Sequence, residues 1–208
     1  MICERETGKR IYTIGYSAFD IDSFICALKD YGVNCLIDVR SVPSSSYFPE
    51  YNEKALKSRL EIEHILYRHY PEFGARQPAR QYYSKDGYLD FDLYLKSNRF
   101  LGGIERVLAG MRMNYCFSLM CAEKDPVNCH RAIMVARGFE EAGCTVQHIR
   151  IDGEEKLFLE GQRELERRLM KKQGDDPDQV SMLDNMEERI ARAYYKQNAL
   201  IGFRINDN

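Results

Sequence analysis

Strand-like and helix-like hydrophobic patterns alternate along the first part of the chain. Residues 11–16, IYTIGY, form a run of β-branched and aromatic residues, which is typical of a strand. Apolar positions in FICALKDY then recur with helical spacing, and the pattern stops at Gly32. The next stretch, VNCLIDV, is continuously apolar, as in a strand that is buried on both faces. These patterns predict a strand-helix-strand unit.

The same alternation continues to about residue 151. EKALKSRLEI has a helical pattern, HILYRHY predicts a third strand, and the helical stretches DLYLKS and GGIERVLAGM precede the strand YCFSLMC. We expect a helix from Asp125 to Ala142 and then the strand CTVQHIRI. Because crossover helices force neighbouring strands to be parallel, the predicted fold is α/β in three layers, with a mostly parallel sheet flanked by helices.

The pattern changes after Asp152. LFLEGQRELERRLMKK balances acids and bases along an expected helix, and QGDDPD predicts a turn or hinge. One face of a last helix consists of Met182, Met186, Ile190, Ala193 and Gln197. We therefore expect an α/β domain over residues 1–152 that carries the site. Residues 153–208 would form a C-terminal helical extension, packed on the same domain or on a partner subunit in a homodimer.

Charge and composition say more about the cellular compartment of the protein than about its function. The formal net charge of −2 gives no global reason to bind nucleic acid or an anionic membrane. No apolar run approaches the roughly 18 residues of a membrane span, so we expect a cytoplasmic protein without a membrane partner. Seven cysteines, an odd number, fit a reducing compartment. Four of them lie in apolar patterns and should be small buried hydrophobes: Cys26, Cys35, Cys116 and Cys144.

Polar residues gather where the predicted strands end. In parallel sheets, ligands bind outside the carboxyl ends of the strands. The residues at these ends are Tyr16 and Ser17, then Asp38, Arg40 and Ser41, and finally Cys121 and Glu123. Asp38 and Arg40 would point to one face of a strand. Their pairing could order the turn, or it could orient the planar guanidinium of Arg40 toward an anionic substrate. The two interpretations are compatible, because an arginine held by an aspartate is already oriented.

The segment LMCAEKDPVNCHRAIMVA concentrates the most reactive side chains. Asp125 is a plausible N-cap with Pro126 at the first helical position, which would place Cys129, His130 and Arg131 in the opening turns. The exposed N–H groups and the helix dipole there favour an anion and lower the pKa of a cysteine.

Two other interpretations of this segment remain open. Cys121, Cys129 and His130 offer three zinc ligands, although neighbours on a helix diverge by about 100° and a fourth ligand such as His148 or His69 would have to come from elsewhere. We therefore predict no metal or cofactor, with zinc as the alternative. A purely structural turn, with packed thiols and a paired Arg131, would also explain the composition.

Residues 71–90 lack a clean period, and a loop of this length is often a lid or binding loop. It interleaves cations with aromatic rings: Arg76, Arg80 and Lys85 with Phe73, Tyr82, Tyr83 and Tyr88. Such a mixture can stack and neutralise nucleotides or single strands. A solvated loop whose tyrosines lie on the core explains it equally well, so nucleic acid is not the favoured partner.

Four motifs in this order, IYTIGYS, DVRSVP, YPEFGAR and LMCAEKDPVNCHR, resemble the Domain of Unknown Function 488 family over roughly residues 10 to 150. The resemblance implies a cytoplasmic prokaryotic α/β domain without an assigned reaction. The signature positions that it implies are Asp38, Arg40, Cys121, Glu123, Cys129, His130 and Arg131. One departure is Phe73-Gly74-Ala75, where the family usually has Leu-Gly-Gly.

Together these features suggest an enzyme that acts on a small anionic or phosphate-bearing substrate, such as a nucleotide. Cys121 or Cys129 would be the thiolate nucleophile, and Glu123 or His130 would move protons. The anion-binding and substrate-binding candidates are Arg40, Arg131, Asp38, Ser41, Tyr16, Ser17 and Arg76. The alternative is a metal-binding or nucleic-acid-binding regulatory module without turnover.

Overall fold

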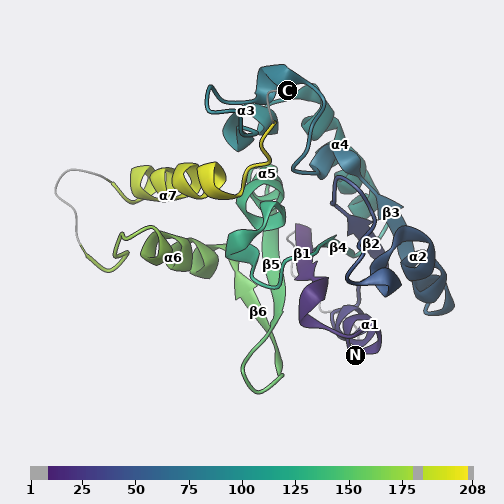
Figure 1. Cartoon of the computed structure of the whole chain (residues 1–208). Coiled ribbons are helices and arrows are strands. Elements are labelled where there is room, and N and C mark those ends of the chain that lie inside the picture. Colours follow the sequence, from purple (N-terminus) through teal and green to yellow (C-terminus); the bar gives the residue numbers. More distant parts are fainter. Residues whose placement is uncertain (1–8, 180–184, 206–208) are drawn as a thin grey trace.

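The chain folds around a six-stranded sheet in the order β3-β2-β4-β1-β5-β6 (Figure 1). The computed structural model describes residues 9–179 and 185–205. Its strands are β1 (Lys9–Gly15), β2 (Cys35–Asp38), β3 (Leu66–His69), β4 (Phe117–Cys121), β5 (Cys144–Ile151) and β6 (Leu157–Gly161). The first five run parallel, and β6 pairs antiparallel with β5. The predicted α/β fold with a mostly parallel sheet is confirmed.

Helices cover both faces of the sheet and make it the middle of three layers. They are α1 (Ile21–Asp30), α2 (Glu53–Ile62), α3 (Phe91–Leu95), α4 (Asn98–Arg112), α5 (Arg137–Glu141), α6 (Gln162–Lys172) and α7 (Met186–Ile201). Alternate residues of β1 show the division, because Ile11 belongs to one hydrophobic cluster and Tyr12 and Ile14 to the other. The Tyr12 face packs against α1 and α2, and the Ile11 face packs against the remaining helices. Within the described ranges, no helix combines the length and the apolar character that crossing a membrane requires.

The helix predicted from Asp125 begins later than expected. Asp125 caps only a 3-10 turn, Pro126–Asn128, and Cys129 is extended with φ −130° and ψ 135°. The continuous helix follows as a π-helical segment, Arg131–Ala136, and then α5. A helix through this region would use the carbonyl of Val127 internally, but that carbonyl accepts a hydrogen bond from Gln197 of α7 over 2.8 Å. A tertiary contact therefore breaks the predicted helix.

The segment LFLEGQRELERRLMKK is also not helical throughout. Leu157–Gly161 forms β6, and α6 begins only at Gln162. Glu160 holds the edge strand in place, because its buried carboxylate forms ion pairs with Arg150 of β5 and Arg168 of α6. Figure 1 shows α6 and α7 side by side next to this end of the sheet.

Residues of α6 and α7 contribute to the same hydrophobic cluster as the sheet. Leu165 and Leu169 of α6 and Ala193 and Tyr194 of α7 are buried in it. Of the predicted face of the last helix, Gln197 is fully buried and Met186 is exposed, and Met182 lies outside the described residues.

The four cysteines predicted to be buried divide into two groups. Cys35 and Cys144 are buried as expected. The prediction is wrong for Cys26, which is exposed, and Cys116 is half-buried. Cys26 lies between two buried pairs of α1 residues, Phe24-Ile25 and Ala27-Leu28, so the helical period turns it to solvent.

Candidate functional site

The strand ends meet at one edge of the sheet, as the parallel topology requires. Gly15 of β1 is in register with Cys121 of β4, and Asp38 of β2 is in register with Met120 of β4. The side chains of Cys121 and Asp38 nevertheless point to opposite faces of the sheet. Cys121 joins the cluster of the Ile11 face, whereas Tyr67, which binds Asp38, belongs to the Tyr12 face. The sequence candidates therefore form two separate groups.

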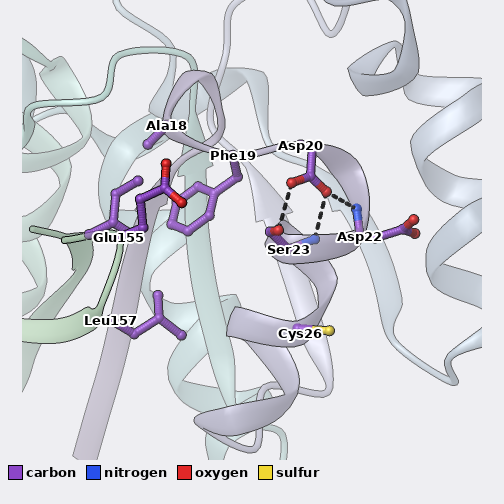
Figure 2. Close-up of a pocket in the computed structure, with 9 residues that line it drawn as sticks. Ala18, Phe19, Asp20, Asp22, Ser23, Cys26, Glu155 and Leu157 are labelled. Atoms are coloured by element: carbon purple, nitrogen blue, oxygen red, sulfur yellow. Dashed lines mark hydrogen bonds between the residues drawn. The ribbon is translucent and has the colours of Figure 1, made fainter. Parts of the chain in front are cut away.

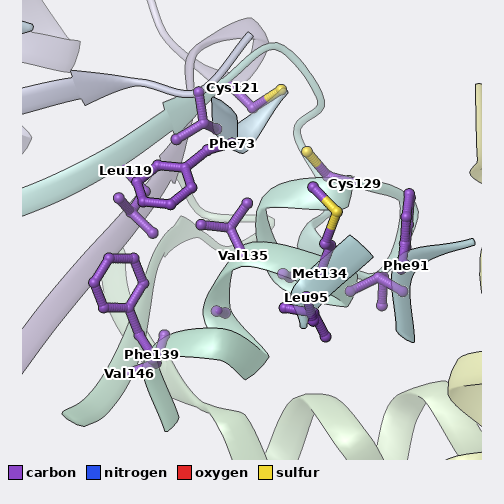
Figure 3. Packing of buried hydrophobic residues seen from close by; sticks show 14 of the residues in the cluster. Phe73, Phe91, Leu95, Leu119, Cys121, Cys129, Met134, Val135, Phe139 and Val146 are labelled. Carbon is purple, nitrogen blue, oxygen red and sulfur yellow. The ribbon is translucent and has the colours of Figure 1, made fainter. Parts of the chain in front are cut away.

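The first group is a cysteine cluster that consists of Cys121, Glu123, Cys129 and His130. Cys121 ends β4, Cys129 directly precedes the helix, and Figure 3 shows their sulfur atoms facing one another. The ligating atoms of the two cysteines and His130 all lie within 4.8 Å of one another, and all three residues are buried. The Glu123 carboxylate lies 2.7 Å from the Cys129 sulfur. Because Cys129 is extended and not helical, its side chain can converge with that of its neighbour His130.

His130 has a defined orientation in this cluster. Its Nε2 atom lies 3.0 Å from the carbonyl oxygen of Val39 at the end of β2. A carbonyl can only accept, so Nε2 carries a proton and Nδ1 is the atom that faces the thiols. Nδ1 lies 3.8 Å from the Cys121 sulfur.

The cluster holds its two thiols in different protonation states. Burial would raise the pKa of Cys129, but hydrogen bonding from Cys121 and the positive charges of Arg131 and His130 outweigh it, so this pKa falls well below the ordinary value. The Cys121 pKa is raised well above its ordinary value, because its S–H group donates a hydrogen bond to Cys129 and because the thiol is buried. Cys129 is therefore the thiolate of the pair.

The acid and the imidazole around Cys129 respond to its charge. Displacement of water from the carboxyl group and the charge of Cys129 raise the pKa of Glu123, although the residue as a whole remains exposed. A carboxylate and a thiolate in contact would repel, so ionisation of Cys129 favours the protonated form of Glu123. Burial opposes the charged form of His130, but its contact with Cys129 prevails and raises its pKa.

Arg131 acts as a clamp on the loop that follows β4. The residue has no exposed surface. Its guanidinium donates to the carbonyl of Glu123 over 2.6 Å and, more weakly, to that of Lys124 over 3.4 Å. The loop passes so close to Gly15 that a Cβ there would lie 2.0 Å from the Glu123 carbonyl oxygen. Both terminal nitrogens of Arg131 thus donate to backbone, the buried Nε has no partner among the described residues, and the residue contributes its charge to the cluster.

The second group is an ion pair between Asp38 and Arg40 on the opposite face. Arg40 donates from Nε over 2.9 Å and from Nη2 over 2.6 Å to the fully buried Asp38 carboxylate. Nη2 also donates to the carbonyl of Tyr51, and Tyr67 donates its hydroxyl to Asp38. The ring of Tyr16 lies under the guanidinium, 5.2 Å from ring centre to Cζ. Most of the Arg40 donors are therefore already satisfied within the protein.

Both groups lie inside a segment that matches a known family model. The model described as Domain of unknown function DUF488 matches residues 20–137, which is more than half of the chain. The chain belongs to the DUF488 family. Searches of curated proteins and of solved structures returned no match.

In this DUF488 chain, the remaining candidates have mainly backbone contacts. The Ser17 amide donates to the carbonyl of Ala122, which ties the end of β1 to the loop after β4. The Ser41 hydroxyl accepts from the amide of Arg76 over 2.8 Å, and Gly74 packs so closely that a Cβ would lie 2.6 Å from the Ser41 hydroxyl oxygen. The Arg76 side chain is exposed and lies over the ring of Phe203.

The DUF488 loop over residues 71–90 is anchored by its aromatic residues. Phe73 and Tyr88 are buried, and Tyr82 and Tyr83 pack partly against the core, as the solvated-loop interpretation requires. Ala75, the departure from the usual family motif, is not among the residues with positive φ, so its Cβ brings no backbone strain.

A hollow of about 550 Å³ next to α1 is chemically unlike an anion site (Figure 2). Asp20, Asp22 and Glu155 contribute carboxylates to its wall, and the exposed Cys26 lies beside them. Asp20 is already used as the α1 N-cap, because it accepts from the amides of Asp22 and Ser23.

Sequence reasoning missed several residues that complete these groups. Tyr51 and Tyr67 hold the Asp38–Arg40 pair, and Gly15 makes room for the loop over Cys129. Gly15 ends the predicted first strand, so its position carried a weak signal. Tyr51 and Tyr67 follow Asp38 at a distance in the sequence, and no local pattern singles them out.

Proposed function

We propose that the protein is an enzyme in which the Cys129 thiolate attacks the electrophilic centre of a small substrate. The observation that carries the proposal is the convergence of Cys121, His130 and the buried Arg131 on Cys129, which lowers the pKa of its thiol. Thiolates, not thiols, are nucleophiles, and cationic surroundings at a helix start are where proteins stabilise them. The exposed Glu123 lies against Cys129 and would move aside to admit substrate.

The proton positions suggest how a substitution could proceed. As the Cys129 sulfur forms a bond to an electrophilic centre, the bond to the leaving group breaks and His130 can supply that group with a proton. Water would then attack the same centre and break its bond to sulfur, which restores the Cys129 thiolate, while Glu123 or His130 accepts a proton from the water. Cys121 would act as a positioning residue, because its S–H group donates to the Cys129 thiolate.

Thiolate titration tests this function. We expect alkylation of Cys129, mapped by mass spectrometry from about pH 4 to about pH 10, to follow a pKa below that of an ordinary cysteine. Cys26 provides an accessible reference thiol in the same sample, and Cys144 a buried one whose pKa burial raises. Cys129 is only 1 % exposed, so a reagent has little access to it. A second readout avoids this problem: the ultraviolet absorbance of thiolate is measured against pH for wild type and for C129S, and the difference reports Cys129. Cys129 that ionises only in the ordinary range would refute the proposal.

Zinc binding is a second candidate function, favoured by the His130 contacts. With Nε2 bound to Val39, Nδ1 is free to coordinate, and a histidine bound in this way is typical of protein metal sites. Ligands around a tetrahedral zinc lie roughly 3.5 to 3.8 Å apart, from Zn–S of about 2.3 Å and Zn–N of about 2.0 Å. The 3.8 Å between Nδ1 and the Cys121 sulfur is about 0.3 Å longer than the nitrogen–sulfur spacing of such a site. Cys121, Cys129 and His130 would bind the ion, with water or Glu123 in the fourth position.

Metal content separates the two candidates. Protein purified without a chelating step is analysed for zinc per chain, alongside C121S as a variant that lacks one ligand. About one zinc per wild-type chain, lost in C121S together with protection of Cys129 from alkylation, would support the metal site. Zinc-free wild type with an early-ionising Cys129 would support the nucleophile.

A further inference from the structure

A second site lies on the loop over residues 71–90, where the C-terminal segment meets it. A pocket of about 430 Å³, here called the arginine pocket, is lined by Arg76, Gln77, Pro78, Arg80, Tyr83, Phe203, Arg204 and Ile205. Figure 1 shows the chain after α7 returning to the region of α3, which brings these two segments together. The amide of Leu89 donates to the carbonyl of Phe203, and the amide of Ile205 donates to the carbonyl of Gly87. Backbone hydrogen bonds therefore hold the C-terminal segment against the loop.

Positive charge in this pocket is not neutralised by the described part of the protein. Arg76, Arg80 and Arg204 are all exposed, and none forms an ion pair with a carboxylate among residues 9–179 and 185–205. No acidic side chain belongs to the lining. Three guanidinium groups that repel one another around a concave surface favour an anion with several acceptor oxygens.

Two of the arginines are held in position without losing their charge. The Arg76 guanidinium lies 4.9 Å from the ring centre of Phe203. Arg204 donates to the carbonyls of Asp86 and Ala199 and lies over Tyr88. Such contacts reduce the entropy lost when an anion binds, because the side chains are already ordered.

Gln77 contributes a fixed, neutral side chain to the wall of the pocket. The residue is 4 % exposed, and its Nε2 group donates to the carbonyls of Pro71 and Gly74. These bonds fix the amide, so Oε1 must be the acceptor, and it has no hydrogen-bond partner. The side chain therefore adds no negative charge that would oppose an anion beside the three arginines.

We propose that the arginine pocket binds a nucleoside phosphate. The arginines would hold the phosphate, and Tyr83 and Phe203 would line the nucleoside end. This binding does not require the cysteine cluster. A short segment nevertheless contacts both sites. The carbonyl of Val39 accepts a hydrogen bond from His130, and two residues later the hydroxyl of Ser41 accepts one from the backbone amide of Arg76.

Calorimetric titration of the full chain with adenosine monophosphate tests the pocket. We expect wild-type protein to bind, and R80Q to lose affinity by about tenfold or more, because one charge-assisted contact is removed. R112Q is the matched control, since Arg112 is exposed on α4 away from the pocket lining. C129S should bind as wild type does, which separates this site from the proposed nucleophile.

Two further titrants decide the ligand class. Inorganic phosphate should bind more weakly than the nucleotide; equal affinity would overturn the nucleoside part of the proposal. A single-stranded oligonucleotide that binds more tightly than the nucleotide, with a steep salt dependence, would overturn it in favour of a nucleic-acid surface. Absence of nucleotide binding, or equal binding by wild type and R80Q, would overturn the site altogether.

Discussion

The Nε2 atom of His130 donates to the carbonyl oxygen of Val39 over 3.0 Å, and this bond ties the start of the helix after β4 to the end of β2. The same bond directs Nδ1 of the imidazole toward the two thiols. The charge state of Cys129 therefore depends on a contact between segments about ninety residues apart in sequence.

Substituting His130 should raise the pKa of Cys129. A glutamine in H130Q can keep a donor near Val39 but removes the cation that lowers this pKa. We expect the alkylation profile of Cys129 to move toward the ordinary cysteine range, with little change in the circular dichroism spectrum. H69Q is the matched control, because His69 also contacts a backbone carbonyl, that of Arg40, at the same sheet edge. Identical profiles for H130Q and wild type would contradict the assigned role.

Removal of the Arg131 clamp should destabilise the protein. R131M leaves the carbonyls of Glu123 and Lys124 without their donor, and we expect a loss of about 2 kcal/mol in the free energy of unfolding. Urea denaturation measures this loss, and R112M, at an exposed position on α4, should stay within about 0.5 kcal/mol of wild type. Equal stability of the two variants would mean that the clamp contributes nothing.

A methyl group at Gly15 should displace the loop over the cysteine cluster. In G15A the added Cβ would clash with the carbonyl oxygen of Glu123, and relief of the clash should cost about 1–3 kcal/mol. We expect lower thermal stability and faster alkylation of Cys129, because the loop no longer covers it. G153A controls for the substitution itself, since nothing lies within 4 Å of a Cβ at that position. A G15A protein that matches G153A in both measurements would show that the loop adapts freely.

His148 should make the stability of the fold depend on pH. Burial, together with the charge of Arg131, lowers the pKa of His148 to about 3 from its ordinary value of 6.5. The ring is neutral in the folded protein, between Thr13 and Gln162. Between these two pH values the unfolded chain binds a proton that the folded chain does not. The free energy of unfolding should therefore fall by about 1.4 kcal/mol for each pH unit below about 6.5.

Urea denaturation across this pH range isolates the His148 contribution. H148Q should show a shallower decline than wild type, because the titrating ring is gone. H64N, which removes an exposed imidazole at a position with positive φ, should retain the wild-type slope. If the slopes of H148Q and wild type coincide, His148 does not remain neutral in the folded state.

Much of the fold follows from hydrophobic periodicity. The strands from IYTIGY to CTVQHIRI and the helix EKALKSRLEI lie where their patterns predict, because period and burial are local properties of the sequence. The errors occur where a tertiary contact, either to a backbone group or between side chains, opposes the local pattern. Gln197 takes the carbonyl of Val127 and breaks the predicted helix, and the ion pairs of Glu160 belong to a strand where a helix was expected.

The sequence by itself determined which chemical groups reach the carboxyl edge of the sheet, since parallel strands must end together there. Tertiary structure decided how those groups are used. The extended backbone of Cys129 turns its thiol toward His130, strand alternation sends Arg40 to the opposite face, and burial makes Arg131 a clamp. Pairing of the C-terminal segment with the loop over residues 71–90 creates the arginine pocket. These outcomes depend on hydrogen bonds and packing between distant segments, which no local pattern encodes.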